Sequence, residues 1–506
     1  MTVTLNSCTL SGIEPFLVKV EVDLSNGLPR CQIVGLPDSA VQEAGERVRS
    51  AIKNSGYDFP IRRMTINLAP ADIRKEGSGF DLSMALGILA ASYQLPEGSF
   101  SDFLVVGELG LNGSIRPVPG VVAMASVIQR IGLKKMIVPV ENLQEALAFP
   151  DLEVWPVASI QDAVLIALES RAPVKETISW APDESYPLDF EEVKGQEHAK
   201  RSLEIAAAGN HNLILIGPPG SGKTMLAERL PGILPPFTFG ECLEVSKIQS
   251  VAGVLRKEEG LSRRRPIRAP HVSMSYAGMV GGSSSLRPGE LSLAHRGVLF
   301  MDELPEFHRD VLESLRQPLE EKRVTVVRLS GSITYPADFL FVGAMNPCPC
   351  GFYGDFYQNC VCRPTDRLHY RRRLSGPLMD RIDLHVEVTR LTYEKLYHPE
   401  KPESSRQIKK RVVKAREVQL SRFGKVEITN SKMNQKGLEK YCKLSPEAQE
   451  LLKRAYEKLY FSARGHGKIL KIARTIADLA DSKTIEVLHL AEALQYRVLD
   501  RNLLHE

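Results

Sequence analysis

The feature that most constrains this chain is the run Gly217-Pro-Pro-Gly-Ser-Gly-Lys-Thr224, which fits the pattern G-x-x-x-x-G-K-[ST]. It follows the apolar segment Asn212–Ile216, which is typical of a buried strand, and it precedes a stretch typical of a helix beginning at Lys223. A strand, a glycine-rich turn and a helix in this order favour a loop whose backbone N–H groups surround phosphate oxygens. A chance glycine-rich turn rarely has both flanking elements. The pattern therefore predicts a parallel α/β sheet that binds a nucleotide at its edge.

The residues of this loop have separable expected roles. The Lys223 ammonium supplies a positive charge to the β- and γ-phosphates, and the Thr224 hydroxyl can ligate Mg²⁺. We therefore expect ATP and Mg²⁺ as the cofactors of the site. The residues expected to bind ATP are Gly217, Pro218, Pro219, Gly220, Ser221, Gly222, Lys223 and Thr224.

Two further strands are expected to bring acidic and polar groups to the same edge. The segment Gly297–Glu303 is an apolar strand that ends in two acids. Asp302 can hold the Mg²⁺ shell, and Glu303 can orient or deprotonate the attacking water. A third strand, Phe339–Ala344, leads to Asn346, whose amide would lie between the other two strands near that water. Asn346 alone is typical of a turn, but the order of the three strands favours the catalytic role.

Arg381 lies in the segment Leu374–Leu384. A guanidinium presented by a neighbouring subunit can stabilise charge on the transferred phosphoryl group. An ordinary surface charge, or a local pair with Asp380 or Asp383, explains the same residue. The residues alone leave both interpretations open.

The length of 506 residues indicates several domains, since single domains run to about 100–200 residues. Residues 1–170 alternate short strands with helices and are expected to form a mixed α/β or α+β domain. The proline-containing stretch 171–188 is the expected linker. Residues 189–390 are expected to form the α/β core, and residues 391–506 a helical domain. Its expected helices are Ser405–Phe423, Pro446–Leu459, Ile469–Asp481 and Ile485–Tyr496.

The net charge of +4 is close to neutral for so long a chain, so any contact with DNA must come from local clusters. The start of the chain has no basic segment followed by an apolar one, and no run of about 18 apolar residues occurs that would span a bilayer. We expect a cytoplasmic protein with no membrane partner.

Four of the eight cysteines lie within fifteen residues, at Cys348, Cys350, Cys360 and Cys362. Four thiolates are enough for a tetrahedral, structural Zn²⁺ site that closes the intervening loop. The Cys-x-Cys spacing is shorter than in common zinc sites, and four reduced thiols are the alternative. The cluster follows Asn346 directly, so a metal there would stiffen that residue.

Lysine and arginine residues gather at three places. The cluster at 263–268 lies between the first two strands of the ATP site, and the cluster at 322–328 opens a predicted hairpin with strands Val324–Arg328 and Ile333–Tyr335. Such side chains would bind phosphates without reading bases. Solvated surface charge is the alternative, and a subunit-interface role is a second one for residues 371–373. The candidate DNA contacts are Arg263, Arg264, Arg265, Arg268, Lys322, Arg323 and Arg328.

Several strings in order along nearly the whole chain resemble one family, the magnesium-chelatase-like AAA+ proteins called ComM or YifB. They include Val34-Gly-Leu-Pro-Asp, Ile66-Asn-Leu-Ala-Pro-Ala-Asp, Pro288-Gly-Glu-Leu-Ser-Leu-Ala-His, Asp302-Glu-Leu-Pro-Glu-Phe, Asn346-Pro-Cys-Pro-Cys-Gly and Ile469-Leu-Lys-Ile-Ala-Arg-Thr-Ile-Ala-Asp-Leu.

The resemblance implies a hexameric AAA+ ring of the helix-2-insert group, with DNA-stimulated ATPase and branch-migration helicase activity. It implies action on single-stranded or branched DNA, in natural transformation and homologous recombination. It also implies that Arg381 is the arginine finger and that Arg464 is the sensor-2 arginine, with Arg474 as a second candidate.

The implied fold class is an α/β multidomain protein. It comprises an N-terminal Lon-protease-like (S5 domain 2-like) α+β domain, a P-loop AAA+ α/β core with a helix-2 insert, and a C-terminal helical lid. Lon chemistry needs a Ser nucleophile and a Lys base. Gly79 stands where the serine belongs and Ser78 is one place off, which argues against a protease. A metal-chelatase motor subunit and a Lon-like protease or adaptor remain the alternative functions.

Overall fold

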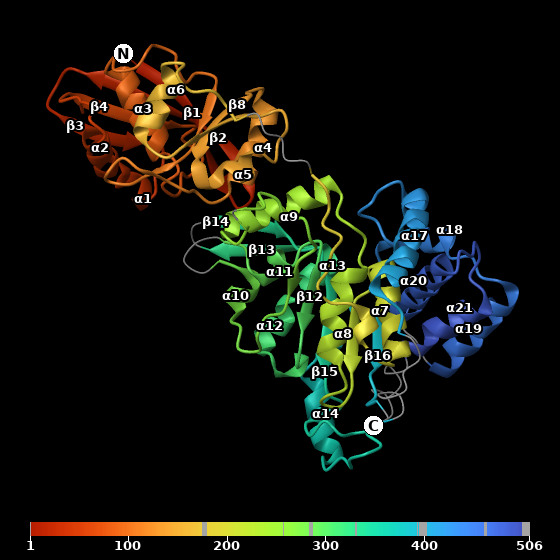
Figure 1. Cartoon of the computed structure of the whole chain (residues 1–506). Coiled ribbons are helices and arrows are strands. Elements are labelled where there is room, and N and C mark those ends of the chain that lie inside the picture. The colour runs from red at the N-terminus through yellow and green to blue at the C-terminus, as the bar shows by residue number, and fades with distance from the viewer. Residues whose placement is uncertain are drawn as a thin grey trace. The chain divides into compact units, whose positions relative to one another are not determined.

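The structure is a computed structural model and describes residues 2–174, 180–256, 258–282, 287–328, 331–391, 393, 402–459 and 463–497 (Figure 1). The chain divides into two compact units. The first comprises Met1–Ala181 and Thr238–Arg263, and the second comprises Pro182–Phe237 and Arg264–Glu506. The stretch 238–263, which lies within the range expected for the ATPase core, thus packs with the amino-terminal residues. Residues 175–179 of the expected linker lie outside the described residues.

The first unit is built on a seven-stranded mixed sheet in the order β3-β4-β2-β1-β5-β8-β9. The hairpin β1–β2 pairs antiparallel, whereas β5, β8 and β9 run parallel to one another. Helix α3 (Asp81–Ala91) is buried along its whole length, which explains why its sequence shows little polar–apolar periodicity. The strands are β1 Thr2–Ser11, β2 Glu14–Ser25, β3 Arg30–Val34, β4 Arg63–Ala69, β5 Phe103–Val105, β8 Lys135–Pro139 and β9 Glu153–Val157.

Helix α9 (Phe239–Ala252) belongs to this unit although it follows the first nucleotide-binding strand in sequence. Thr238 begins it with a capping box, and the helix packs on α4 (Val121–Ile131). The Ser250 hydroxyl donates to the Glu145 carboxylate, and the Ser250 carbonyl accepts from the Gly120 N–H at 3.2 Å. The remaining helices of the unit include α1 Ser39–Gln42, α2 Ala44–Asn54, α5 Leu143–Ala146 and α6 Ile160–Ala167.

The second unit contains a five-stranded sheet in the order β11-β12-β15-β10-β16, and all its strands are parallel. Both faces of a parallel sheet are covered by helices, so its strands are continuous apolar runs. The strands are β10 Leu213–Ile216, β11 Ile267–Arg268, β12 Val298–Met301, β15 Leu340–Met345 and β16 Leu384–Glu387. The predicted order of three nucleotide-binding strands is confirmed, with β15 lying between β10 and β12.

The predicted hairpin is also confirmed: β13 (Arg323–Arg328) pairs antiparallel with β14 (Gly331–Pro336). Val324 and Tyr335 face each other and are buried, whereas Val327 is exposed. Residues 329 and 330 lie outside the described residues.

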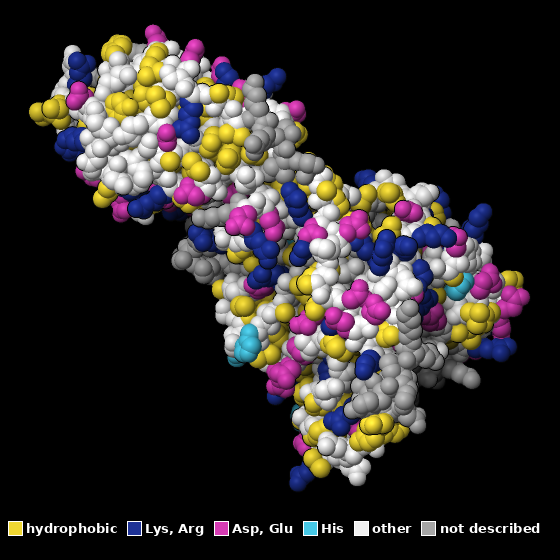
Figure 2. Space-filling model, in the orientation of Figure 1, with side chains coloured by type: hydrophobic (Ala, Val, Ile, Leu, Met, Phe, Trp, Pro, Cys, Tyr) yellow, Lys and Arg dark blue, Asp and Glu magenta, His cyan; other side chains and the backbone are white. Residues whose placement is uncertain are grey.

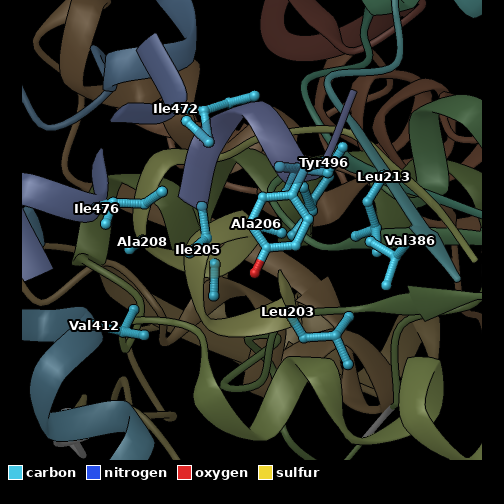
Figure 3. Close-up of a cluster of buried hydrophobic side chains, with 14 of the residues drawn as sticks. Leu203, Ile205, Ala206, Ala208, Leu213, Val386, Val412, Ile472, Ile476 and Tyr496 are labelled. Carbon is cyan, nitrogen blue, oxygen red and sulfur yellow. The ribbon is translucent and has the colours of Figure 1, made fainter. Parts of the chain in front are cut away.

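The carboxyl-terminal helices share one core with the sheet. The buried cluster drawn in Figure 3 contains Leu203, Ile205, Ala206 and Ala208 of α7 (Glu197–Gly209) together with Val412, Ile472 and Tyr496. Because α7 immediately precedes β10, this packing joins the helical region to the nucleotide-binding strand. The helices are α17 Ser405–Phe423, α18 Gln435–Tyr441, α19 Pro446–Leu459, α20 Ala463–Leu479 and α21 Val487–Gln495.

The remaining helices of the second unit are short. They are α8 Lys223–Arg229, α10 Tyr276–Val280, α11 Glu290–Leu293, α12 Arg309–Ser314, α13 Arg316–Glu321, α14 Pro364–Arg372 and α15 Gly376–Met379. Among the described residues, no helix combines the length and the apolar character that crossing a bilayer requires.

Candidate ATP-hydrolysis site

The glycine-rich loop joins β10 to α8 at the carboxyl end of the parallel sheet. Gly220 and Gly222 have φ values of +74° and +88°, a region that favours glycine. At Gly217 the constraint is space, since a Cβ there would lie 2.0 Å from the carbonyl oxygen of Val388. These three glycines let the loop turn sharply and leave the first N–H groups of α8 without helical partners, as anion binding requires.

The Lys223 ammonium lies inside this loop. It donates to the carbonyl oxygens of Gly217 at 2.8 Å and Pro218 at 3.0 Å, and to Asn346 Oδ1 at 3.3 Å. Burial lowers the pKa of Lys223, while the charges of Asp302 and Glu303 oppose this shift. Phosphate oxygens are stronger acceptors than the three neutral oxygens it now contacts, because their hydrogen bonds are charge-assisted.

Asp302 and Glu303 follow β12 at the same edge of the sheet. Thr224 Oγ1 donates to Asp302 Oδ2 at 2.7 Å, so the two residues expected to bind Mg²⁺ are adjacent. Asp302 Oδ1 accepts from the Glu303 N–H at 2.8 Å. Glu303 has a left-handed backbone, with φ of +49°, and its side chain is exposed. This turn separates the two carboxylates, so that one contacts Thr224 while the other extends toward solvent.

Asn346 follows β15, the strand between β10 and β12. Its amide oxygen accepts from Lys223, and its backbone lies against the hydroxyl of Tyr370. Burial, with the nearby charge of Glu306, raises the pKa of Tyr370 to about 12. Lys223 and Tyr370 thus hold Asn346 between the glycine-rich loop and the end of β12, the strand that Asp302 and Glu303 follow.

The structure brings together Lys223, Thr224, Asp302 and Asn346 through hydrogen bonds, with Glu303 next to them. This set can bind nucleotide phosphates, hold Mg²⁺ and place a water for attack. It does not bring the three arginines expected at the site into hydrogen-bond contact with the set.

The Arg381 guanidinium donates to the Glu320 carboxylate and to the Pro377 carbonyl at 2.7 Å. The sequence suggested Asp380 or Asp383 as ion-pair partners, but Glu320 of α13 is the partner found. Arg464 is exposed near the start of α20. Arg474 is buried, and its guanidinium donates to Asp478 and to backbone carbonyls of the same helical region. The Arg474 guanidinium is therefore held by partners within the helical region and does not contact the glycine-rich loop.

Gln196 is a contributor that the sequence did not reveal. Its φ is +61°, and its side-chain amide donates to the carbonyl oxygens of Ser221 at 3.1 Å and Thr389 at 2.7 Å. It thereby links the start of α7 to the glycine-rich loop and to the segment after β16. A left-handed glutamine before a helix has no distinctive sequence pattern, and Gly195 beside it is the only local hint.

Comparison with known proteins identifies the family. Three family models match: "Magnesium chelatase, subunit ChlI" over residues 189–396, "Subunit ChlI of Mg-chelatase" over residues 20–142, and "Magnesium chelatase, subunit ChlI C-terminal" over residues 402–497. The chain is 44% identical over 498 residues to the YifB protein of Salmonella typhimurium (strain LT2), covering 98% of this chain and 96% of the relative. It is 43% identical over 498 residues to competence protein ComM of Haemophilus influenzae (strain Rd), covering 97% and 96%.

The chain belongs to the ComM/YifB family of magnesium-chelatase-like AAA+ proteins. Membership of this family implies an ATPase that uses ATP and Mg²⁺. The chain is also 26% identical over 254 residues to the magnesium-chelatase 67 kDa subunit of Heliobacterium mobile, but this match covers 44% of the chain and 37% of that protein.

In this ComM/YifB-family chain, most residues of the two basic clusters have intrachain partners. Arg264 pairs with Asp183 at 2.6 Å, and Arg268 pairs with Glu290 through two bonds of 2.6 Å. Arg265 stacks on Phe237, with its guanidinium carbon 4.6 Å from the ring centroid. These partners are distant in sequence, so the pattern of charges alone did not reveal them.

In the basic cluster of the hairpin, residues 322–328, one described side chain, Arg323, is largely exposed to solvent. Lys322 is partly buried, burial lowers its pKa, and its ammonium lies 4.0 Å from Asp338. Arg323 is 61% exposed and pairs with Glu321 at 3.0 Å. The side chain of Arg328 lies outside the described residues. Arg263, which belongs to the first unit, is partly buried.

The four cysteines of the cluster converge. Their sulfur atoms all lie within 4.8 Å of one another, and Cys348 is buried while the other three are partly buried. The Sγ–Sγ distances are 3.4 Å for Cys348–Cys350 and 3.7 Å for Cys348–Cys360 and Cys350–Cys360. All are much longer than the roughly 2.05 Å of a disulfide, so these are free thiols.

Ser78, considered above for Lon-type chemistry, and Lys75, the lysine nearest to it in sequence, have separate partners. The Ser78 hydroxyl donates to Glu108, and the buried Lys75 ammonium donates to the carbonyl of Pro70. Burial lowers the pKa of Lys75. The two residues do not form the nucleophile–base hydrogen bond that covalent catalysis uses.

Proposed function

We propose that this protein is a ring-forming AAA+ DNA translocase that drives branch migration with the energy of ATP hydrolysis. It would promote the integration of donor DNA during natural transformation and homologous recombination. The observation that carries the proposal is the similarity over 97% of the chain to competence protein ComM, together with an assembled set of phosphate-binding and acidic side chains.

A hexameric ring accounts for Arg381. Its guanidinium is directed to Glu320 and Pro377 rather than to the glycine-rich loop of its own chain. An arginine finger acts at the site of the neighbouring subunit, so a contact with its own loop is not required. We propose that Arg381 has this role and that Arg464 contacts the nucleotide from the helical lid.

For DNA, the hairpin β13–β14 is the better-supported contact. On the face shown in Figure 2, Lys and Arg side chains are interspersed with Asp and Glu, so no uniform basic surface is visible there. Arg323 is the most exposed of the described candidate side chains, and its pair with Glu321 is an exposed surface pair, a kind that contributes little to stability. The Arg323 guanidinium can therefore exchange Glu321 for a DNA phosphate at little cost.

We also propose two finer features of the fold. The first unit would be a Lon-protease-like (S5 domain 2-like) domain without protease chemistry, and the residues between α8 and β12 would form the helix-2 insert of the AAA+ core.

At the cysteine cluster we propose a structural Zn²⁺ bound by Cys348, Cys350, Cys360 and Cys362. Four sulfur atoms around Zn²⁺ at about 2.3 Å would stand about 3.8 Å apart, close to the observed separations.

The proposal is tested by the DNA dependence of the ATPase. We expect single-stranded or branched DNA to raise the rate of ATP hydrolysis, with an effect that weakens as salt increases. Arg323→Ala is expected to reduce the stimulation and leave the DNA-free rate unchanged. Arg454→Ala is the matched control, since Arg454 is 69% exposed and pairs with a glutamate at 3.0 Å in the helical lid.

The metal-chelatase motor remains the second candidate, because all three matching family models describe a magnesium-chelatase subunit. A chelatase motor would be stimulated by its partner subunits and a porphyrin rather than by DNA. Purified protein that neither binds DNA nor moves a synthetic Holliday junction in the presence of ATP would rule out the translocase.

A further inference from the structure

The cysteine loop, Cys348–Cys362, contacts the glycine-rich loop of the ATP site, Gly217–Thr224, which we also call the P-loop. Gly351 lies between the two Cys-x-Cys pairs and has φ of +86°. A Cβ placed on Gly351 would lie 2.6 Å from Cδ and 2.8 Å from Cγ of Pro219. The backbone of the cysteine loop is therefore packed directly against the ring of a P-loop proline.

Residues of the same two loops also line one small cavity. It has a volume of about 150 Å³ and lies beside the ATP site. Gly217 and Pro218 line it on one side, and Tyr353, Gly354 and Phe356 line it on the other. The cysteine loop therefore approaches the P-loop from Gly351 through Phe356, on both sides of Tyr353.

The cysteine loop is anchored at its first end to the nucleotide site and at its other end to helix α14. Its first cysteine follows Asn346 by two residues, and Asn346 accepts a hydrogen bond from Lys223. After its last cysteine, α14 begins at Pro364, and Arg367 of this helix stacks on Tyr353 at 4.1 Å. At the tip of the loop, Asp355 pairs with Arg390, just beyond β16, at 3.1 Å.

The interior of the loop offers few apolar contacts to hold this shape. Phe356, Tyr357 and Val361 are all strongly exposed. The cysteines gather at its base instead, and the Cys350 N–H points at Cys362 Sγ at 3.4 Å. The cysteine cluster therefore closes the base of the loop, in addition to the contacts of Tyr353 and Asp355.

We propose that a thiophilic divalent ion, Zn²⁺, held by the four cysteines controls nucleotide binding by bracing the P-loop through Gly351 and Pro219. This inference rests on the zinc site proposed above. With the ion bound, Gly351 supports Pro219 and Asn346 stays beside Lys223. Without it, the cysteine loop relaxes, the P-loop loses this support, and affinity for ATP falls.

The test measures zinc content and nucleotide affinity on the full-length protein, without DNA. We expect about one Zn²⁺ per chain, released in Cys360→Ser. In that variant the Kd for a fluorescent ATP analogue should rise at least about tenfold, which corresponds to about 1.4 kcal/mol. Cys31→Ser is the control for loss of a thiol, because Cys31 lies outside the cluster and is exposed.

A second pair of variants separates the brace from general damage to the fold. Gly351→Ala should keep its zinc and still weaken nucleotide binding, because Pro219 must move by about 1 Å to restore a normal carbon–carbon separation. Gly354→Ala is its matched control, since Gly354 has φ of +80° in the same loop but no atom within 4 Å of the added carbon. It should carry the same backbone strain and bind nucleotide as the wild-type protein does.

Zinc-free protein with full nucleotide affinity would overturn both the metal site and the brace. Bound zinc with an unchanged Kd in Gly351→Ala, or an equal loss of affinity in Gly354→Ala, would overturn the brace alone. Failure to move a DNA junction would count against the translocase and not against the brace, because these measurements contain no DNA.

Discussion

Replacing Glu303 by Gln is the change that most sharply separates nucleotide binding from hydrolysis. Glu303 follows Asp302 at the carboxyl end of β12, with its side chain exposed, and no hydrogen bond to its carboxylate is found among the described residues. The substitution keeps the size of the side chain and removes its charge. Since the Thr224–Asp302 hydrogen bond and the contacts of Lys223 with the loop and Asn346 do not involve Glu303, ATP and Mg²⁺ should still bind.

The size of the effect follows from these contacts. A surface substitution that breaks no intrachain bond changes stability by no more than about 0.5 kcal/mol. Loss of a general base costs about 10²–10⁴ in rate, or roughly 3–5 kcal/mol of transition-state stabilisation. We therefore expect a fall of at least about a hundredfold in the hydrolysis rate at saturating ATP, with a Kd for ATP within about threefold of the wild-type value.

Single-turnover hydrolysis and equilibrium binding of a fluorescent ATP analogue measure the two quantities. Glu306→Gln is the matched control three residues away. Its carboxylate accepts from Arg373 at 2.6 Å in a half-exposed pair, whose loss costs no more than about 1 kcal/mol of stability. Hydrolysis by Glu303→Gln at close to the wild-type rate would show that another residue activates the water.

Three further predictions address the P-loop, the ring and acid stability. Gly217→Ala should abolish ATP binding by isothermal titration with the fold intact, because the new Cβ would lie 2.0 Å from the Val388 carbonyl oxygen and would displace the loop; measurable binding would contradict this. Arg381→Ala should bind ATP without hydrolysing it, and mixing it with Lys223→Ala should restore part of the ATPase rate if the guanidinium acts in trans; no recovery would favour a role within its own chain. Asp383→Asn should lower the melting temperature near neutral pH, with the difference from the wild type shrinking below about pH 4, where the unfolded-state carboxyl is protonated. Burial alone would raise the pKa of Asp383, but Lys468 at 3.3 Å and the neighbouring histidine hold that pKa well below its usual range, so its stabilisation is present at neutral pH and is lost in acid; a pH-independent difference would contradict this assignment.

The sequence predicted the nucleotide-binding strands and loop well because each has a strong local pattern. Helix α17 was predicted with the bounds observed, Ser405–Phe423, since its apolar residues recur at helical spacing. Helix α20 was predicted to start at Ile469 but begins at Ala463. Gly465 and Gly467 lie in its first turns, and glycine at these positions lowers helix propensity and obscures the period.

The rest depended on contacts between residues distant in sequence. Arg265 and Arg268 resemble free cations in the sequence, but the fold gives them Phe237 and Glu290 as partners. The packing of Gly351 on Pro219 joins loops more than a hundred residues apart. A local sequence pattern describes one helix, strand or loop at a time. It cannot show which residues from distant parts of the chain the fold brings into contact.

Branch migration of a synthetic Holliday junction tests the central claim most directly. The full-length protein with ATP and Mg²⁺ should convert the labelled junction into its two duplex products, and neither Lys223→Ala nor Glu303→Gln should do so. A junction that remains intact with wild-type protein, under conditions where DNA binds and ATP is hydrolysed, would contradict the account.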